Sequence, residues 1–259
     1  SGIWAQTAGT TNVTVNSGVT VSGPTAITLG GAGGNTLVVN GTLNSTTAGT
    51  SGYVLAPGAG PLTLTVGAAG AINGPLTFGA GADTFTNNRT AGFTQSGTID
   101  FGAGADTFNT STTFTQNAAI TFGDGNDTVN NTGVFNATGT TDFGAGTDTF
   151  NNGTTGTGAV AGTLNAFSGA TFTNLEAFNN NAGLIDLRDG ATGDILNLGG
   201  ANYTATGGAR LGIDVGGGAN LTSDRLVYGG TTTGVTTILP TFLTGSAIID
   251  TTGALVVEA

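Results

Sequence analysis

Short alternations of apolar and polar residues run along most of the chain and predict strands of only a few residues. Early in the chain they form the pairs Val13/Val15, Val19/Val21, Ile27/Leu29 and Leu37/Val39, each followed by Asn, Ser or Gly. Leu62–Val66 is a longer alternation, and Pro57 and Pro61 beside it indicate corners or an edge. No stretch shows a helical period. The patterns predict an all-β chain of short strands and tight corners.

One phrase occurs four times between residues 78 and 150. Its copies are Phe78-Gly-Ala-Gly-Ala-Asp83-Thr-Phe85, Phe101-Gly-Ala-Gly-Ala-Asp106-Thr-Phe108, Phe122-Gly-Asp-Gly-Asn-Asp127-Thr-Val129 and Phe143-Gly-Ala-Gly-Thr-Asp148-Thr-Phe150. The leading Phe residues fall at positions 78, 101, 122 and 143, which gives steps of 23, 21 and 21. A period in the twenties predicts a solenoid, in which each phrase is a Gly-rich corner between one short strand and the next.

Whole coils repeat in phase, because Phe93, Phe114 and Phe135 follow one another at the same step of 21. If these rings pointed outward, they would form an aromatic stripe for carbohydrate or protein contact, but a phased Phe stack favours the core. With about 21 residues per coil, the chain would make on the order of twelve coils and a rod of roughly 60 Å. Asn- and Thr-rich patches follow each phrase, so Asn side chains are expected to bond up and down the stack.

We expect a single β-helix domain over residues 1–259. Residues 1–75 would form irregular N-terminal coils, 76–152 the phased repeats, 153–206 further coils after a loop at 153–162, and 207–259 a C-terminal segment. The composition fits this reading, with 49 Gly, 37% hydrophobic residues and only 7% charged residues. Thr and Val suit strands, Gly and Asn suit corners, and a core one coil wide needs few large side chains.

The charge balance restricts the partners. Fifteen acidic residues against four basic ones, with no His, give a formal net charge of −11, so nucleic acid and anionic lipid are poor partners. No apolar run approaches the roughly 18 residues of a membrane span, so no direct membrane insertion is expected. The N-terminus lacks signal-peptide features, so an exported protein would be represented by its mature form or by an excised piece. The absence of Cys fits either a cytosolic protein or a chain that crosses an oxidising periplasm unfolded.

Five segments between residues 170 and 238 follow one another in a fairly specific order and spacing. They are 171–179, 184–190, 193–198, 209–215 and 223–231. Together they resemble the C-terminal end of bacterial autotransporter passenger domains, the pertactin-like β-helices of type V secretion. The resemblance implies a right-handed parallel β-helix at a Gram-negative cell surface, exported through the outer membrane by a C-terminal translocator barrel, with 207–259 as a folding or capping segment. The chain departs from that pattern by stopping at Ala259 without a barrel, so either the passenger is separated from it or the β-helix has another use.

The strongest candidate for chemistry is the Asp ladder, which we define as Asp83, Asp106, Asp127 and Asp148. Its phrase matches most of the Gly-x-Gly-x-Asp-x-U portion of calcium-binding β-rolls, and Asp124 adds a carboxylate that makes Asp124 and Asp127 the best single calcium candidate. Those sites need the phrase about every nine residues, whereas here it recurs every 21 to 23. The favoured alternative is structural: each Asp would accept bonds from backbone N–H groups of its own corner, in solvent, where repulsion between neighbours is roughly 1 kcal/mol or less.

A second candidate is the cluster of Asp186, Arg188, Asp189 and Asp194, because β-helix polysaccharide lyases and hydrolases use Asp with a basic residue. We favour local pairing of these charges in solvent. No His, Cys or Gly-x-Ser-x-Gly phrase supports nucleophilic hydrolysis, and the chain is not expected to be an enzyme or to need a cofactor. Nearer the C-terminus, ion pairs are expected between Arg210 and Asp214 and between Arg225 and Asp224.

The expected function is structural or adhesive. A rod offers long faces and few deep pockets, so it suits a stalk or a contact surface that engages other cells, matrix or carbohydrate. Open strand edges would also allow end-to-end or lateral self-association, so a surface-layer or filament subunit is the nearer alternative. A carbohydrate-active enzyme is the farther one.

Overall fold

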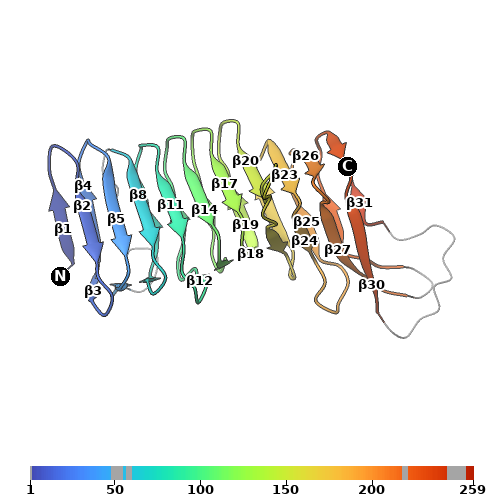
Figure 1. The fold of residues 1–259 in the computed structure, drawn as a ribbon, viewed down its shortest axis with the longest axis horizontal. Coiled ribbons are helices and arrows are strands. Elements are labelled where there is room, and N and C mark those ends of the chain that lie inside the picture. Colours follow the sequence, from blue (N-terminus) through green and yellow to red (C-terminus); the bar gives the residue numbers. More distant parts are fainter. Residues whose placement is uncertain (1, 48–54, 57–59, 218–220, 244–254) are drawn as a thin grey trace.

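The computed structural model describes residues 2–47, 55–56, 60–217, 221–243 and 255–259. This part of the chain is all-β and contains no helix, and its parallel strands stack into a β-solenoid of about nine turns (Figure 1). The predicted parallel β-helix is therefore confirmed. Pro57 and residues 48–52 of the expected polar loop lie outside the described residues, while Pro61 directly precedes a strand.

One ten-stranded sheet runs along the rod, and we call it the long sheet. Its strands are β2 (Asn12–Val15), β5 (Asn35–Val39), β8 (Leu62–Val66), β11 (Thr84–Asn87), β14 (Thr107–Thr110), β17 (Thr128–Asn131), β20 (Thr149–Asn152), β23 (Ala177–Asn181), β26 (Asn202–Thr206) and β29 (Thr232–Gly234). Every neighbouring pair is parallel, so each coil contributes one strand to this sheet.

Two further sheets form the other sides of the coils after the first turns. An eight-stranded sheet holds β10 (Leu76–Thr77), β13 (Ile99–Asp100), β16 (Ile120–Thr121), β19 (Gly139–Asp142), β22 (Ala170–Thr173), β25 (Ile195–Asn197), β28 (Arg225–Val227) and β31 (Val257–Glu258). A seven-stranded sheet holds β12 (Phe93–Thr94), β15 (Thr113–Thr115), β18 (Val134–Asn136), β21 (Thr163–Asn165), β24 (Leu184–Asp186), β27 (Arg210–Val215) and β30 (Thr237–Phe242).

The N-terminal coils have two shorter sheets. One contains β1 (Ile3–Gln6), β4 (Ile27–Gly30) and β7 (Leu55–Ala56), and the other contains β3 (Thr20–Gly23), β6 (Thr42–Ser45) and β9 (Ala71–Asn73). The predicted apolar pairs lie in or directly beside these strands and those of the long sheet. Val19 is the most exposed member of these pairs, since it lies just before β3 and is 47% exposed.

The coil length is nearly constant only in the phased repeats. There Phe85 pairs with Phe108, Phe108 with Val129 and Val129 with Phe150, which reproduces the predicted steps of 23, 21 and 21. Elsewhere the corners are longer: Leu37 pairs with Leu64, a step of 27, and Phe150 pairs with Phe178, a step of 28 that crosses the predicted loop at 153–162. The expectation of twelve coils was too high because it extended the shortest coil over the whole chain.

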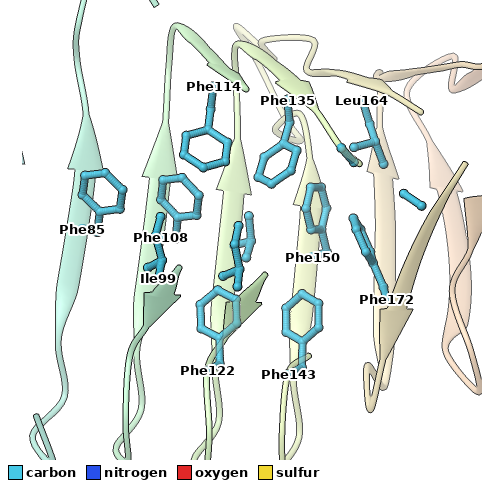
Figure 2. Packing of buried hydrophobic residues seen from close by; sticks show 14 of the residues in the cluster. Phe85, Ile99, Phe108, Phe114, Phe122, Phe135, Phe143, Phe150, Leu164 and Phe172 are labelled. Atoms are coloured by element: carbon cyan, nitrogen blue, oxygen red, sulfur yellow. The ribbon is translucent and has the colours of Figure 1, made fainter. Parts of the chain in front are cut away.

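Stacked aromatic rings fill the core (Figure 2). The ring centroids of Phe78, Phe101, Phe122 and Phe143 are 4.8, 4.5 and 5.0 Å apart in succession, close to the separation of neighbouring strands. Phe93, Phe114 and Phe135 are also buried and pack against one another, so the favoured core placement is confirmed and the alternative of an outward aromatic stripe is wrong.

The corners need Gly because successive coils approach closely there. Gly123 has a φ of 95°, and a Cβ on it would collide with the carbonyl oxygen of Gly102, the equivalent residue one coil earlier. Any other residue at this corner would therefore be strained by its conformation and would push two coils apart.

Asn side chains join the coils as the sequence predicts. On the outside, the Nδ2 of Asn130 donates to Asn109 and that of Asn151 donates to Asn130, both at 2.9 Å. Inside, Asn131 donates to Asn152 at 2.9 Å. Both ladders run parallel to the aromatic stack, and the inner one pairs amide groups that are buried.

A candidate functional site: the buried Asp ladder

The carboxylates of the Asp ladder connect consecutive coils. The backbone N–H of Asp83 donates to the Oδ1 of Asp106, that of Asp106 to Asp127, and that of Asp127 to Asp148, each at 2.7 Å. Each carboxylate therefore accepts from the equivalent residue one coil earlier. The expectation that each Asp bonds the backbone of its own corner holds only for Asp83, whose Oδ2 also accepts from Gly79 at 3.0 Å.

The ladder continues beyond the four phrases. At its start, the N–H of Leu62 donates to Asp83 at 2.6 Å. At its end, the N–H of Asp148 donates to the Oε2 of Glu176 at 2.8 Å. Sequence reasoning missed Glu176, although Glu176-Ala-Phe178 occupies the place of Asp-Thr-Phe in the next coil. Glu176 lies in register with Asp148 although its coil is seven residues longer than the one before it.

The ladder is buried, which corrects the expectation of solvent-exposed carboxylates. The four Asp side chains are at most 1% exposed. Asp106, Asp127 and Asp148 each keep one buried Oδ2 without a hydrogen-bond partner. Burial raises the pKa of Asp106 to about 7 and that of Asp127 to about 6, against the opposing effect of the backbone N–H bonds. Burial also raises the pKa of Asp83 and of Asp148.

The structure separates the two residues that the sequence pairs as the best calcium candidate. Asp124 is exposed on the corner, whereas Asp127 is buried within the ladder. Among the described residues, no group of three or more acidic, His or Cys side chains is arranged to hold a metal ion. One oxygen of each ladder carboxylate is already used by a backbone N–H, and the geometry therefore fits a structural role. Calcium binding stays the alternative, and only a binding measurement tests it.

The second candidate cluster forms a close local ion pair. Both guanidinium nitrogens of Arg188 that face Asp186 donate to it, Nε at 2.6 Å and Nη2 at 2.9 Å. Asp189 is exposed and accepts from the N–H of Ala191. Asp194 is less solvated than expected, because it is half-buried, one of its oxygens is buried without a partner, and burial raises its pKa to about 6.

The two ion pairs expected further on do not form. Asp214 is buried and accepts from the N–H groups of Asp189 and Gly190, while Arg210 is exposed. Asp224 is buried as well, and Arg225 instead faces Glu258 at 3.4 Å. Asp224 precedes β28 and is buried, whereas Arg225, the first residue of that strand, is partly exposed.

These buried acids repeat the main motif near the C-terminal end. The N–H of Asp214 donates to the Oδ2 of Asp224 at 2.7 Å, and the other oxygen of Asp224 accepts from Gly193 and Asp194. The spacing of ten residues between the two Asp gave no sign of this arrangement. Buried carboxylates that accept hydrogen bonds from backbone N–H groups thus occur both in the Asp ladder and near the C-terminal end of the rod.

Two of the hollows on the described surface are open and lined by uncharged polar side chains. One of about 480 Å³ is lined by small side chains such as Asn44, Asn73 and Ser96. Another, of about 290 Å³, lies among Asn109, Asn130 and their neighbours on the long sheet. Neither contains a titratable side chain.

The comparisons with known proteins found nothing: no family model, no curated protein and no solved structure matches this chain. The resemblance to autotransporter passengers therefore stays a prediction. Within the described ranges, no helix is long and apolar enough to cross a membrane.

Proposed function

We propose that this protein is a β-helix passenger at a bacterial cell surface, where it acts as a stalk or a contact surface. The observation that carries the proposal is the continuity of the rod. The aromatic stack continues from Phe78 to Phe143, and the Asp ladder with its end partners continues from Leu62 of β8 to Glu176 beside β23. Such continuity from coil to coil suits a stiff spacer with long faces (Figure 1).

Adhesion is tested with the purified chain coupled to beads and passed under flow over cultured cells, matrix proteins and a polysaccharide panel. We expect retention on at least one surface above that of beads carrying an unrelated β-protein of similar charge. Retention no greater than that of the control beads on every surface would contradict the adhesive role. Release of unsaturated or reducing sugars from the panel, lost in Asp186→Ala, would instead establish a carbohydrate-active enzyme.

Location is tested separately in the producing bacterium. An antibody against the chain should label intact cells, and external protease should remove the label. Labelling only after the cells are lysed would contradict a surface function.

A self-assembling filament is the second candidate, favoured by the two ends of the rod. β1, β2 and β3 have a hydrogen-bonded neighbour on one side only among the described residues, and Trp4 of β1 is 75% exposed. At the opposite end, Val235 is 79% exposed and Phe242 57% exposed. Open strand edges with apolar side chains favour end-to-end stacking. Filaments in the electron microscope that lengthen with protein concentration and are lost in Trp4→Lys would support assembly over a monomeric stalk.

A further inference from the structure

The outer surface of the long sheet differs from the rest of this acidic protein. None of its ten strands contains an Asp, Glu, Lys or Arg residue, although the chain carries a net charge of −11. Its outward side chains form two files, mostly of Thr and Asn, and we call this surface the Thr/Asn face. The strands lie side by side in one row (Figure 1), so the files run along the rod.

The first file contains six Thr residues in consecutive coils. They are Thr36, Thr63, Thr84, Thr107, Thr128 and Thr149, each paired in register with the next. At the usual strand separation of about 4.8 Å the file is about 24 Å long. The second file lies two residues further along each strand, about 6.6 Å away, and includes Thr65, Thr86, Asn109, Asn130 and Asn151. The face is therefore a regular two-dimensional array of small polar groups.

The hydroxyls of the first file are free to bind something outside the protein. None of the six Thr Oγ1 atoms has a hydrogen bond to another described residue. In the second file, the Asn amides bond to one another at 2.9 Å, which fixes their orientation and leaves Asn130 and Asn151 one N–H and one lone pair each. β-Branched Thr has few rotamers, and buried Phe85, Phe108 and Phe150 hold the strands beneath. The array is thus rigid before any ligand arrives.

The chemistry of the face restricts its occupant. A charged ligand would find no opposite charge, and a sugar ring would find no aromatic side chain to stack on, because no aromatic residue points outward from these strands. A lattice of water molecules needs only hydroxyl and amide groups at a matching repeat, with methyl groups between them. The separation of neighbouring strands is close to the oxygen repeat along one axis of hexagonal ice.

We propose that the Thr/Asn face binds ice. Ordered water would occupy the spaces between the Thr methyl groups and bond to the two files, and the same water would join the crystal surface. The proposal concerns the rod itself and does not rest on its place in the cell.

The test is partition of the purified full chain into slowly grown ice, together with the shape of single ice crystals in its presence. The variant Thr107→Lys/Thr128→Lys places two long charged side chains in the middle of the first file. Its matched control is Thr140→Lys/Thr171→Lys, which changes two Thr residues that pair in register on β19 and β22 of another sheet. Circular dichroism melting checks that both variants fold.

We expect the unchanged chain and the control variant to enter the ice and to facet the crystals, and the Thr107/Thr128 variant to lose both effects. Exclusion of the unchanged chain from ice would overturn the proposal, as would equal partition of the two folded variants. Binding to crystalline cellulose or chitin that depends on Thr107 and Thr128, without partition into ice, would also overturn it and assign the face to a polysaccharide surface.

Discussion

Replacing Asp106 by Asn removes a buried charge but keeps the side-chain oxygen that accepts the N–H of Asp83 at 2.7 Å. Burial raises the pKa of Asp106 from 3.8 to about 7, so the folded protein binds this proton more tightly than the unfolded chain does. The contribution to stability is fully present below pH 3.8 and is lost as the pH rises to about 7. At about 1.36 kcal/mol per pKa unit the loss amounts to roughly 4 kcal/mol.

The assay is urea unfolding followed by circular dichroism at several pH values between about 4 and 8. We expect the unchanged protein to lose stability as the pH rises through this window, and Asp106→Asn to lose markedly less. A protein that becomes more stable from acid to neutral pH, or a variant with the same pH slope as the unchanged chain, would refute the reasoning.

The variant Asp106→Ala separates the charge from the hydrogen bond. It removes the same charge as Asp106→Asn but leaves the buried N–H of Asp83 without an acceptor, which costs about 1–3 kcal/mol. We expect Asp106→Ala to be less stable than Asp106→Asn by that amount at every pH. Equal stability of the two variants would show that the bond between coils contributes nothing.

Three further predictions concern the corners, the core and calcium. Gly123→Ala should destabilise the rod by about 1–3 kcal/mol, because the residue has a positive φ and its new Cβ would meet a carbonyl oxygen one coil earlier. Gly158 also has a positive φ but open space around it, so Gly158→Ala should lower the free energy of unfolding by less in the same urea assay. Phe122→Ala should cost about 3–5 kcal/mol by removing a fully buried ring, against a small effect for Phe167→Ala at 37% exposure, and equal melting shifts would contradict the ring stack. Calcium added to the metal-stripped protein should give no calorimetric heat and no shift in melting temperature, and a shift lost in Asp124→Asn would instead establish an ion site.

The phase of the central repeats was predictable from the sequence because equivalent residues of a solenoid recur along the chain at intervals of one coil. Phe78 and Phe101 occupy equivalent positions one coil apart, and their spacing alone indicates that they stack. The number of coils was not predictable in the same way. Corners such as 153–162 add residues without adding a coil, and no periodic signal marks their length.

The direction in which the Asp side chains point could not be predicted from the sequence either. Asp in a Gly-rich turn commonly bonds its own corner, and that preference suggested exposed carboxylates. In the stacked rod, the coil before each of Asp106, Asp127 and Asp148 presents an N–H that is otherwise unpaired and buried, so the side chains turn inward to meet it. The need to pair a buried backbone N–H therefore outweighed the tendency of Asp to bond within its own turn.

The most direct test of the buried ladder is a carbon-13 NMR titration of the Asp carboxyl groups, assigned with Asp106→Asn and Asp127→Asn. The structure predicts apparent pKa values of about 7 for Asp106 and about 6 for Asp127. Values close to the ordinary 3.8 for both groups would contradict a ladder of buried carboxylates that ties each coil to the one before it.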